Sequence, residues 1–240
     1  MRDSQHARIA SVSGAMKHKN LAAEHSATCR RILDAATRLY RLMGHRKTSV
    51  ADIARECSMS PANVYRFFSS KQAMNDAVAD RLFAEVIALA TEASVTPRTP
   101  AERLRATLAA IEKRHADRFL NEKHLHELMV ISVREDWLVS RSFTERIESI
   151  VADIVSEGIT RHQFQGGDSI IIGRCLLVTT AVFCDPRLVA TTGGFHRPNL
   201  EQIMDFAIGA LRGDSIAHFT GDQLHASREP VCAGSTPPVR

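Results

Sequence analysis

The side chains whose types and spacing could do chemistry are concentrated in residues 47–75, KTSVADIARECSMSPANVYRFFSSKQAMN. This segment holds two short helix-start signals, a tight turn between them and an aromatic cluster after the second helix. Two short helices joined in this way are typical of a helix-turn-helix, which hydrogen-bonds to DNA base edges and phosphates. The sequence therefore predicts nucleic-acid recognition in this segment.

Catalytic signatures are missing from the sequence. There is no Gly-x-Ser-x-Gly, no phosphate-cradling glycine-rich loop and no His-Glu-x-x-His. The cysteines at 29, 57, 175, 184 and 232 form no Cys-x-x-Cys pair and have no histidine at zinc-ligand spacing. We therefore expect no enzyme activity, no catalytic residues, no cofactor and no metal site. The cysteines should be reduced, with a redox switch at Cys57 as the alternative to a small core residue.

Each helix of the pair has its own start signal. Ser49-x-x-Asp52 matches a capping box, and the helix that it opens should end at Cys57-Ser58. Ser60 can cap the second helix, with Pro61 at the first helical position, where its missing N–H costs nothing.

A helix on either side should frame this pair. Ser69-x-x-Gln72 predicts the start of a longer helix, and an upstream helix should exit in the left-handed conformation at Gly44. The apolar stripe of the longer helix is predicted to be Met74, Val78, Leu82, Val86 and Leu89, and that of the upstream helix Ile32, Ala36, Leu39 and Met43.

Three segments together resemble the N-terminal domain of TetR-like (tetracycline-repressor family) transcription regulators. They are Thr48-Ser49-Val50-Ala51-Asp52-Ile53-Ala54, Met59-Ser60 and Val64-Tyr65-Arg66-Phe67-Phe68-Ser69-Ser70-Lys71. The resemblance covers roughly residues 26–75. It departs from the family at the turn, where Ser58 stands in place of the common glycine. Because serine disfavours a positive φ, we expect the turn to be strained or differently shaped.

The resemblance implies roles for individual residues. Those at the start of the recognition helix would read bases: Ser60, Ala62, Asn63 and Arg66. Those at the family's phosphate-contacting positions are Thr48, Ser49, Tyr65 and Lys71. The alternative is that Tyr65 fills the small core and Lys71 is a solvated charge.

The charge distribution agrees with a DNA-binding head. Residues 1–75 carry 13 Lys and Arg against 5 Asp and Glu, a balance of +8, whereas residues 76–240 carry 18 against 22, a balance of −4. A basic N-terminal third on a mildly acidic body is the electrostatic pattern expected for DNA binding.

Beyond residue 76 the apolar periodicity is helical throughout, so the fold class is predicted to be all-α. Helices are expected over residues 72–93, 100–119, 121–134, 140–162, 167–184 and 199–212. The predicted organisation is a disordered basic arm (1–25), a three-helix helix-turn-helix domain (26–75), a C-terminal helical ligand-binding and dimerisation domain (76–212) and a flexible tail (213–240).

The last two predicted helices carry more apolar surface than one chain of this size can cover. Residues 170–183, IIIGRCLLVTTAVF, are apolar on nearly every side. TetR-like regulators pair two such helices with those of a second subunit, which implies a homodimer; interior core of a monomer is the alternative. The predicted dimer residues are Ile171, Leu176, Leu177, Val182, Ile203, Met204, Ala207 and Leu211.

The helices between the head and the dimer helices could enclose a cavity or form a filled core. The resemblance favours a cavity for a small apolar or amphipathic molecule. Its predicted lining is Leu108, Ile111, His115, Phe119, Leu128, Met129, Trp137, Phe143, Ile147 and Val151, with His115, His124 and His126 as candidates to orient a ligand.

Together these observations predict a dimeric, sequence-specific regulator, expected to be a repressor, that a ligand releases from a palindromic operator. The alternative is a helix-turn-helix regulator or architectural DNA-binding protein without a small-molecule ligand. The expected partners are double-stranded DNA, a second copy of the chain and a small-molecule effector, and no membrane. A cytoplasmic, nucleoid-associated location is expected, because the sequence has no uninterrupted apolar stretch of membrane-spanning length and no apolar signal-peptide core.

Overall fold

The computed structural model describes residues 24–96, 98–189 and 198–213, and the regular structure in these ranges is helical throughout. This confirms the all-α prediction. The predicted basic arm up to residue 23 and the predicted tail from residue 214 lie outside the described residues, while residues 24 and 25 belong to the first helix. None of the described helices is long and apolar enough to cross a membrane.

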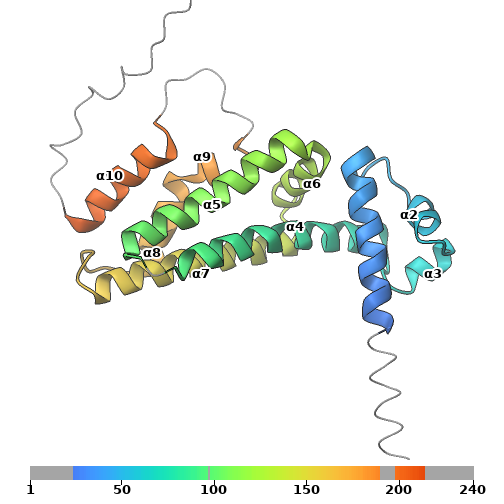
Figure 1. Cartoon of the computed structure of the whole chain (residues 1–240), viewed down its shortest axis with the longest axis horizontal. Coiled ribbons are helices and arrows are strands. Elements are labelled where there is room, and N and C mark those ends of the chain that lie inside the picture. Colours follow the sequence, from blue (N-terminus) through green and yellow to red (C-terminus); the bar gives the residue numbers. More distant parts are fainter. Residues whose placement is uncertain (1–23, 97, 190–197, 214–240) are drawn as a thin grey trace, which may run out of the picture.

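The head consists of a helix over residues 24–43 and the pair α2 (Val50–Glu56) and α3 (Pro61–Tyr65), drawn in blue and cyan in Figure 1. The first helix ends at Gly44, whose φ of 83° is the left-handed exit that the sequence predicts. The head's small core is built from fully buried side chains of all three helices: Ile32, Ala36, Tyr40, Ile53 and Val64.

The helix-start signals form the caps that their residue types predict. Ser49 and Asp52 make a reciprocal capping box, and Ser60 Oγ accepts from the backbone N–H of Asn63 at 3.2 Å. The start predicted at Ser69 is wrong by one residue, because Ser70 Oγ accepts from the Ala73 N–H at 2.9 Å. Two adjacent serines offer the same cap chemistry, so local sequence does not decide between them.

A single long helix, α4 (Lys71–Ser94), runs from the head into the body (Figure 1). Its buried stripe follows a four-residue spacing through Met74, Val78, Leu82 and Val86. The stripe then continues to fully buried Ala90, whereas the predicted Leu89 is 38 % exposed. The sequence prediction chose the larger side chain, but the helical period selects the smaller one.

The body packs on α4. Its helices are α5 (Pro100–Asn121), α6 (Lys123–Arg134), α7 (Leu138–Thr160), α8 (Ser169–Thr179), α9 (Ala181–Cys184) and α10 (Leu200–Arg212). Figure 1 shows α5 and α7 lying along α4, with α8, α9 and α10 at the end of the molecule away from the head.

The single helix predicted over residues 167–184 is instead divided into α8 and α9. The break lies at Thr180, where the hydroxyl donates to the Leu176 carbonyl at 2.8 Å. Thr179 makes the equivalent bond to Cys175 at 2.7 Å. Such back-bonding hydroxyls compete with the backbone ladder, and here two β-branched residues act in succession.

The turn of the helix-turn-helix keeps Ser58 in the left-handed region, with a φ of 51°. The departure from glycine noted in the sequence therefore falls on the residue whose backbone conformation favours glycine. Ser58 is exposed, so its side chain contributes little packing against this cost.

We expect Ser58→Gly to raise the free energy of unfolding by about 0.5–1 kcal/mol, because the strain of a side chain at positive φ disappears. Ser156→Gly is the matched control: Ser156 is also exposed but lies inside α7, where glycine should destabilise by a similar amount. Urea unfolding followed by circular dichroism measures both changes. A Ser58→Gly variant no more stable than the wild type would mean that the turn holds serine without strain.

Candidate nucleic-acid interface and internal pocket

The recognition helix α3 is anchored through one side and open on the other. Val64 is fully buried and fixes α3 to the head core. Ala62 and Arg66 are exposed, Asn63 is half-buried and Tyr65 is 48 % exposed. Tyr40, not Tyr65, fills the head core, so the core-filling alternative for Tyr65 does not hold in this structure.

Other residues of the predicted interface are engaged within the head itself. Thr48 is 2 % exposed and its hydroxyl donates to the Gly44 carbonyl at 2.9 Å. The Lys71 ammonium donates to the Thr48 carbonyl at 2.6 Å and lies 4.4 Å from the centre of the Tyr40 ring. Burial lowers the pKa of Lys71 to about 8. Lys71 is therefore not simply a solvated charge; it ties the loop before α2 to the start of α4.

The two cap serines differ in whether the hydroxyl proton is available to a partner outside the head. The Ser49 hydroxyl donates to Asp52 Oδ2 at 2.6 Å, so its proton is used inside the capping box. The Ser60 hydroxyl only accepts, from Asn63, which leaves its own proton for an outside acceptor.

A shallow groove of about 510 Å³ joins the loop before α2 to the recognition helix. It is lined by Arg46, Lys47, Thr48, Ser49, Val50, Ala51, Pro61, Tyr65 and Lys71. The exposed Arg46 and Lys47 were missed by the site prediction. Their signal in the sequence is two consecutive basic residues shortly before the helix cap at Ser49.

An ion network around the buried Arg118 connects the head to the body. The Arg118 side chain is fully buried; its guanidinium binds Glu85 at 2.6 Å and Glu122 at 3.3 Å. Arg41 of the first helix binds the same Glu122 at 2.9 Å, and Arg114 binds both carboxylates. Burial raises the pKa of Glu122, but its hydrogen bonds and nearby arginine charges outweigh burial, so the net shift is downward.

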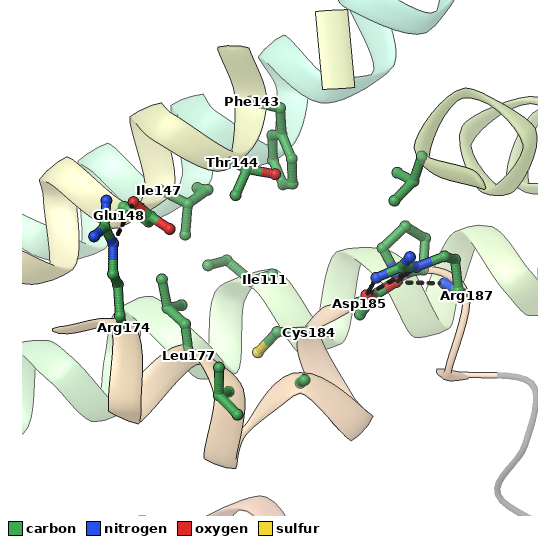
Figure 2. A pocket seen from close by; sticks show the side chains of 14 residues that line it. Ile111, Phe143, Thr144, Ile147, Glu148, Arg174, Leu177, Cys184, Asp185 and Arg187 are labelled. Carbon is green, nitrogen blue, oxygen red and sulfur yellow. Dashed lines mark hydrogen bonds and ion pairs between the residues drawn. The ribbon is translucent and has the colours of Figure 1, made fainter. Parts of the chain in front are cut away.

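A half-open pocket of about 380 Å³ lies between α5, α7 and the α8–α9 segment (Figure 2). Its lining is Ile111, Val133, Phe143, Thr144, Ile147, Glu148, Arg174, Leu177, Val178, Ala181, Cys184, Asp185, Pro186 and Arg187. Two ion pairs stand among the apolar side chains: Arg174 Nε with Glu148 at 3.1 Å, and Arg187 with Asp185. The volume falls within the range of small-molecule sites, about 300–1,000 Å³.

The predicted lining and the observed pocket share Ile111, Phe143 and Ile147. Leu108, Leu128, Met129 and Val151 are completely buried core residues, His115 is buried outside the lining, and Phe119 and Trp137 do not line the pocket. The prediction missed the wall formed by α8 and α9 because it assigned those residues to the dimer face alone.

The predicted dimer residues are partly internal. Leu176 and Met204 are buried in the chain's own core, and Leu177, Val182, Ile203, Ala207 and Leu211 are partly buried against it. The exposed apolar side chains of α8 and α10 are Ile170 (52 %), Ile171 (53 %), Val178 (77 %) and Phe206 (45 %). Of the predicted dimer residues, Ile171 has the most exposed side chain on this surface.

Cys57 lies in the head core, where its thiol is buried. Burial raises the pKa of this thiol, which disfavours the reactive thiolate and with it a redox switch. Cys232 lies outside the described residues. Within the described ranges, no three or more His, Cys, Asp or Glu side chains are grouped so that they could hold a metal ion.

Two family models match the chain. Residues 32–78 match "Bacterial regulatory proteins, tetR family", and residues 100–202 match "Tetracyclin repressor-like, C-terminal domain". No curated protein matches the sequence.

Solved structures share the fold at low identity. A TetR-family regulator, PfmR from Thermus thermophilus, is 22 % identical with a TM-score of 0.51, over 76 % of this chain and 97 % of that one. A putative TetR-family regulator from Mesorhizobium loti is 20 % identical with a TM-score of 0.55, over 79 % and 96 %. A TetR/AcrR-family regulator from Thermobifida fusca is 18 % identical with a TM-score of 0.57, over 85 % and 100 %.

The two family matches follow one another along the chain as head and body do in space, and together they take in most of its length. The chain belongs to the TetR family of transcriptional regulators.

Proposed function

We propose that this regulator binds a palindromic operator as a homodimer, acts as a repressor and is released by a small, mainly apolar molecule. The observation that carries the proposal is the apolar pocket against α7 and α8, in a body joined to an exposed recognition helix through α4. Nothing in the described site favours catalysis, and we assign the protein a purely DNA-binding, regulatory role.

The proposed DNA surface is α3 with the groove beside it. Asn63 and Arg66 suit bidentate bonds to adenine and guanine, and Ala62 between the cap and these residues permits close approach to a base edge. Phosphates would be bound by Ser60, Tyr65, Arg46 and Lys47. Arg46 and Lys47 join this set because they line the groove. Thr48, Ser49 and Lys71 would act indirectly, by fixing the loop that presents these groups.

The proposed dimer face is the exposed apolar surface of α8 and α10. Four large apolar side chains on these two helices are 45–77 % exposed. A second copy of the chain, meeting the same helices through a two-fold axis, would cover them and set two recognition helices about one DNA turn apart.

The proposed release mechanism is a shift between two conformations of the dimer. The ligand must prefer the one in which the heads are wrongly spaced for the operator, since only differential affinity moves an equilibrium. The path from pocket to head runs through α5. Arg118 of this helix binds Glu85 of α4 and also Glu122, and Glu122 in turn binds Arg41 of the head.

We expect Asn63→Ala to weaken the selected operator by about 1–3 kcal/mol and to relax one base position in each half-site, because a bidentate base contact is lost. Lys47→Ala should weaken all sequences alike and reduce the salt slope by about two per dimer, one phosphate contact in each subunit. Selection from random duplexes followed by salt titration measures both; exposed Lys113 on α5 gives the control Lys113→Ala. Recovery of no consensus by the wild type would overturn the operator proposal.

We expect Val178→Glu to convert the dimer to a monomer, because it places two charges in the covered face. Leu138→Glu is the matched control, since Leu138 is 76 % exposed and Val178 77 %, but Leu138 lies at the start of α7 and is not part of the proposed face. Sedimentation velocity distinguishes the two states. If both variants keep the mass of the wild type, α8 is not the interface.

We expect Ala181→Trp to fill the pocket and abolish release from operator DNA by 1-octanol and n-octane, while operator affinity without ligand stays within about twofold. Ala109→Trp, at an exposed site on α5 outside the lining, should respond like the wild type. Fluorescence anisotropy of labelled operator follows release. A wild type that no such compound releases would favour a regulator without a small-molecule ligand.

A further inference from the structure

Two histidines in the body are buried without hydrogen-bond partners. The His115 side chain is fully buried and His126 is 5 % exposed. None of their four ring nitrogens has a partner in this structure. A neutral imidazole has one donor and one acceptor, and burying either unpaired is unfavourable enough to be rare. A ligand that supplies the missing partner would therefore bind with more than the apolar contribution of the pocket.

Both rings lie behind one end of the pocket. His115 follows Ile111 by one turn of α5, and its ring meets the edge of Phe143 with 6.3 Å between centroids. Ile111 and Phe143 both line the pocket, where Figure 2 shows them. Burial lowers the pKa of His115, and the charge of Asp185, another lining residue, acts in the opposite direction.

His126 reaches the same loop from α6. The backbone of Pro186, which lines the pocket, approaches His126 without reaching hydrogen-bonding geometry. The His126 ring packs edge-on against Phe119 with 5.2 Å between centroids. The pair therefore forms a polar layer immediately outside the apolar lining.

This layer is uncharged. Burial, reinforced by the Arg118 charge, lowers the pKa of His115 to about 3, and the same two causes lower that of His126. Both rings are therefore neutral at pH 7. Arg118 shares Glu85 and Glu122 with Arg114 and Arg41, and Arg114 also binds Asp117. Three arginines thus face three carboxylates, which leaves no unpaired positive charge for an anionic ligand.

The charged side chains of the lining are likewise balanced. Glu148 pairs with Arg174 and Asp185 with Arg187, so the pocket has no net charge from these four residues. A ligand carboxylate or ammonium buried beside the two neutral rings would have no unpaired counter-charge next to it, which is costly.

We propose that the ligand of this pocket is an uncharged, mainly apolar molecule with one hydroxyl or carbonyl oxygen, and that this oxygen hydrogen-bonds to His115 and His126 when the Phe143 ring turns aside. The inference rests on the ligand-binding function proposed above and adds the chemical class of the ligand. His115 and His126 then determine specificity, because the apolar lining alone would accept a hydrocarbon equally well.

Matched eight-carbon probes test the proposal: n-octane, 1-octanol, 2-octanone and octanoate, titrated calorimetrically into the wild-type dimer and into His115→Phe. The variant keeps an aromatic ring but removes both nitrogens. We expect it to weaken 1-octanol and 2-octanone about fivefold to tenfold, the usual effect of one buried hydrogen bond, and to leave n-octane unchanged or tighter. His124→Phe, at a half-buried histidine that bonds Glu127 outside the pocket, should bind every probe like the wild type.

A second measurement does not depend on the variant. In the wild type with ¹⁵N-labelled histidine, 1-octanol should shift the ring-nitrogen resonances of His115, and n-octane should not. A third measurement uses the variant: the ligand-free His115→Phe protein should melt at a higher temperature than the wild type, because two of the four unpaired ring nitrogens are removed.

The outcomes separate this inference from the function on which it rests. Equal effects of His115→Phe on 1-octanol and n-octane, or octanoate binding more tightly than 1-octanol and independently of His115, would overturn the inference. If Ala181→Trp still abolished binding of these probes, the pocket function would stand. Failure of every probe to bind the wild type would overturn both.

Discussion

The buried guanidinium of Arg118 constrains the rest of this structure. A fully buried charge is tolerable only beside its counter-charges, so Glu85 of α4 and Glu122 at the junction of α5 and α6 must stay within contact of it. Arg41 of the head binds the same Glu122. Removing Glu85 or Glu122 would leave the buried guanidinium with one carboxylate, which it would share with Arg114. The network therefore joins head, α4 and α5 through specific ion pairs, which apolar packing alone would not provide.

The same network lies between the two proposed sites. Arg118 follows His115 by one turn of α5, on the side of the pocket where the polar layer lies. At the other end of α4, Lys71 holds the carbonyl of Thr48 and thereby the loop before α2. A displacement of α5 would therefore have to break or rearrange the ion pairs of Arg118 before it could move the head. This favours two discrete arrangements over a continuous deformation, which is what a population shift requires.

The sequence predicted what depends on neighbours along the chain. The capping box at Ser49, the cap at Ser60 and the left-handed exit at Gly44 are each determined by residues within four positions, and all three were predicted.

Features that depend on tertiary contacts were not predicted. The bond from Lys71 to the Thr48 carbonyl was not predicted, because the two residues are 23 positions apart in the sequence. In the same way, Ile111, Phe143 and Ile147 were predicted from the apolar faces of α5 and α7, but four other predicted residues are ordinary core. Periodicity identifies the buried face of a helix and does not show whether another side chain fills the space opposite. The wall made by α8 and α9 was missed, because the apolar residues of this segment were assigned to the dimer face alone.

Helix α8 is shared by the pocket and the proposed subunit interface. Val178 lines the pocket and is also 77 % exposed on the outer surface, so a second copy that covers it would close the pocket from outside. Ligand affinity and subunit association are then thermodynamically linked, and each changes the other by the same factor. The amount of effector needed for release would depend on how abundant the regulator is in the cell, so a regulator that controls its own synthesis would also set its own sensitivity.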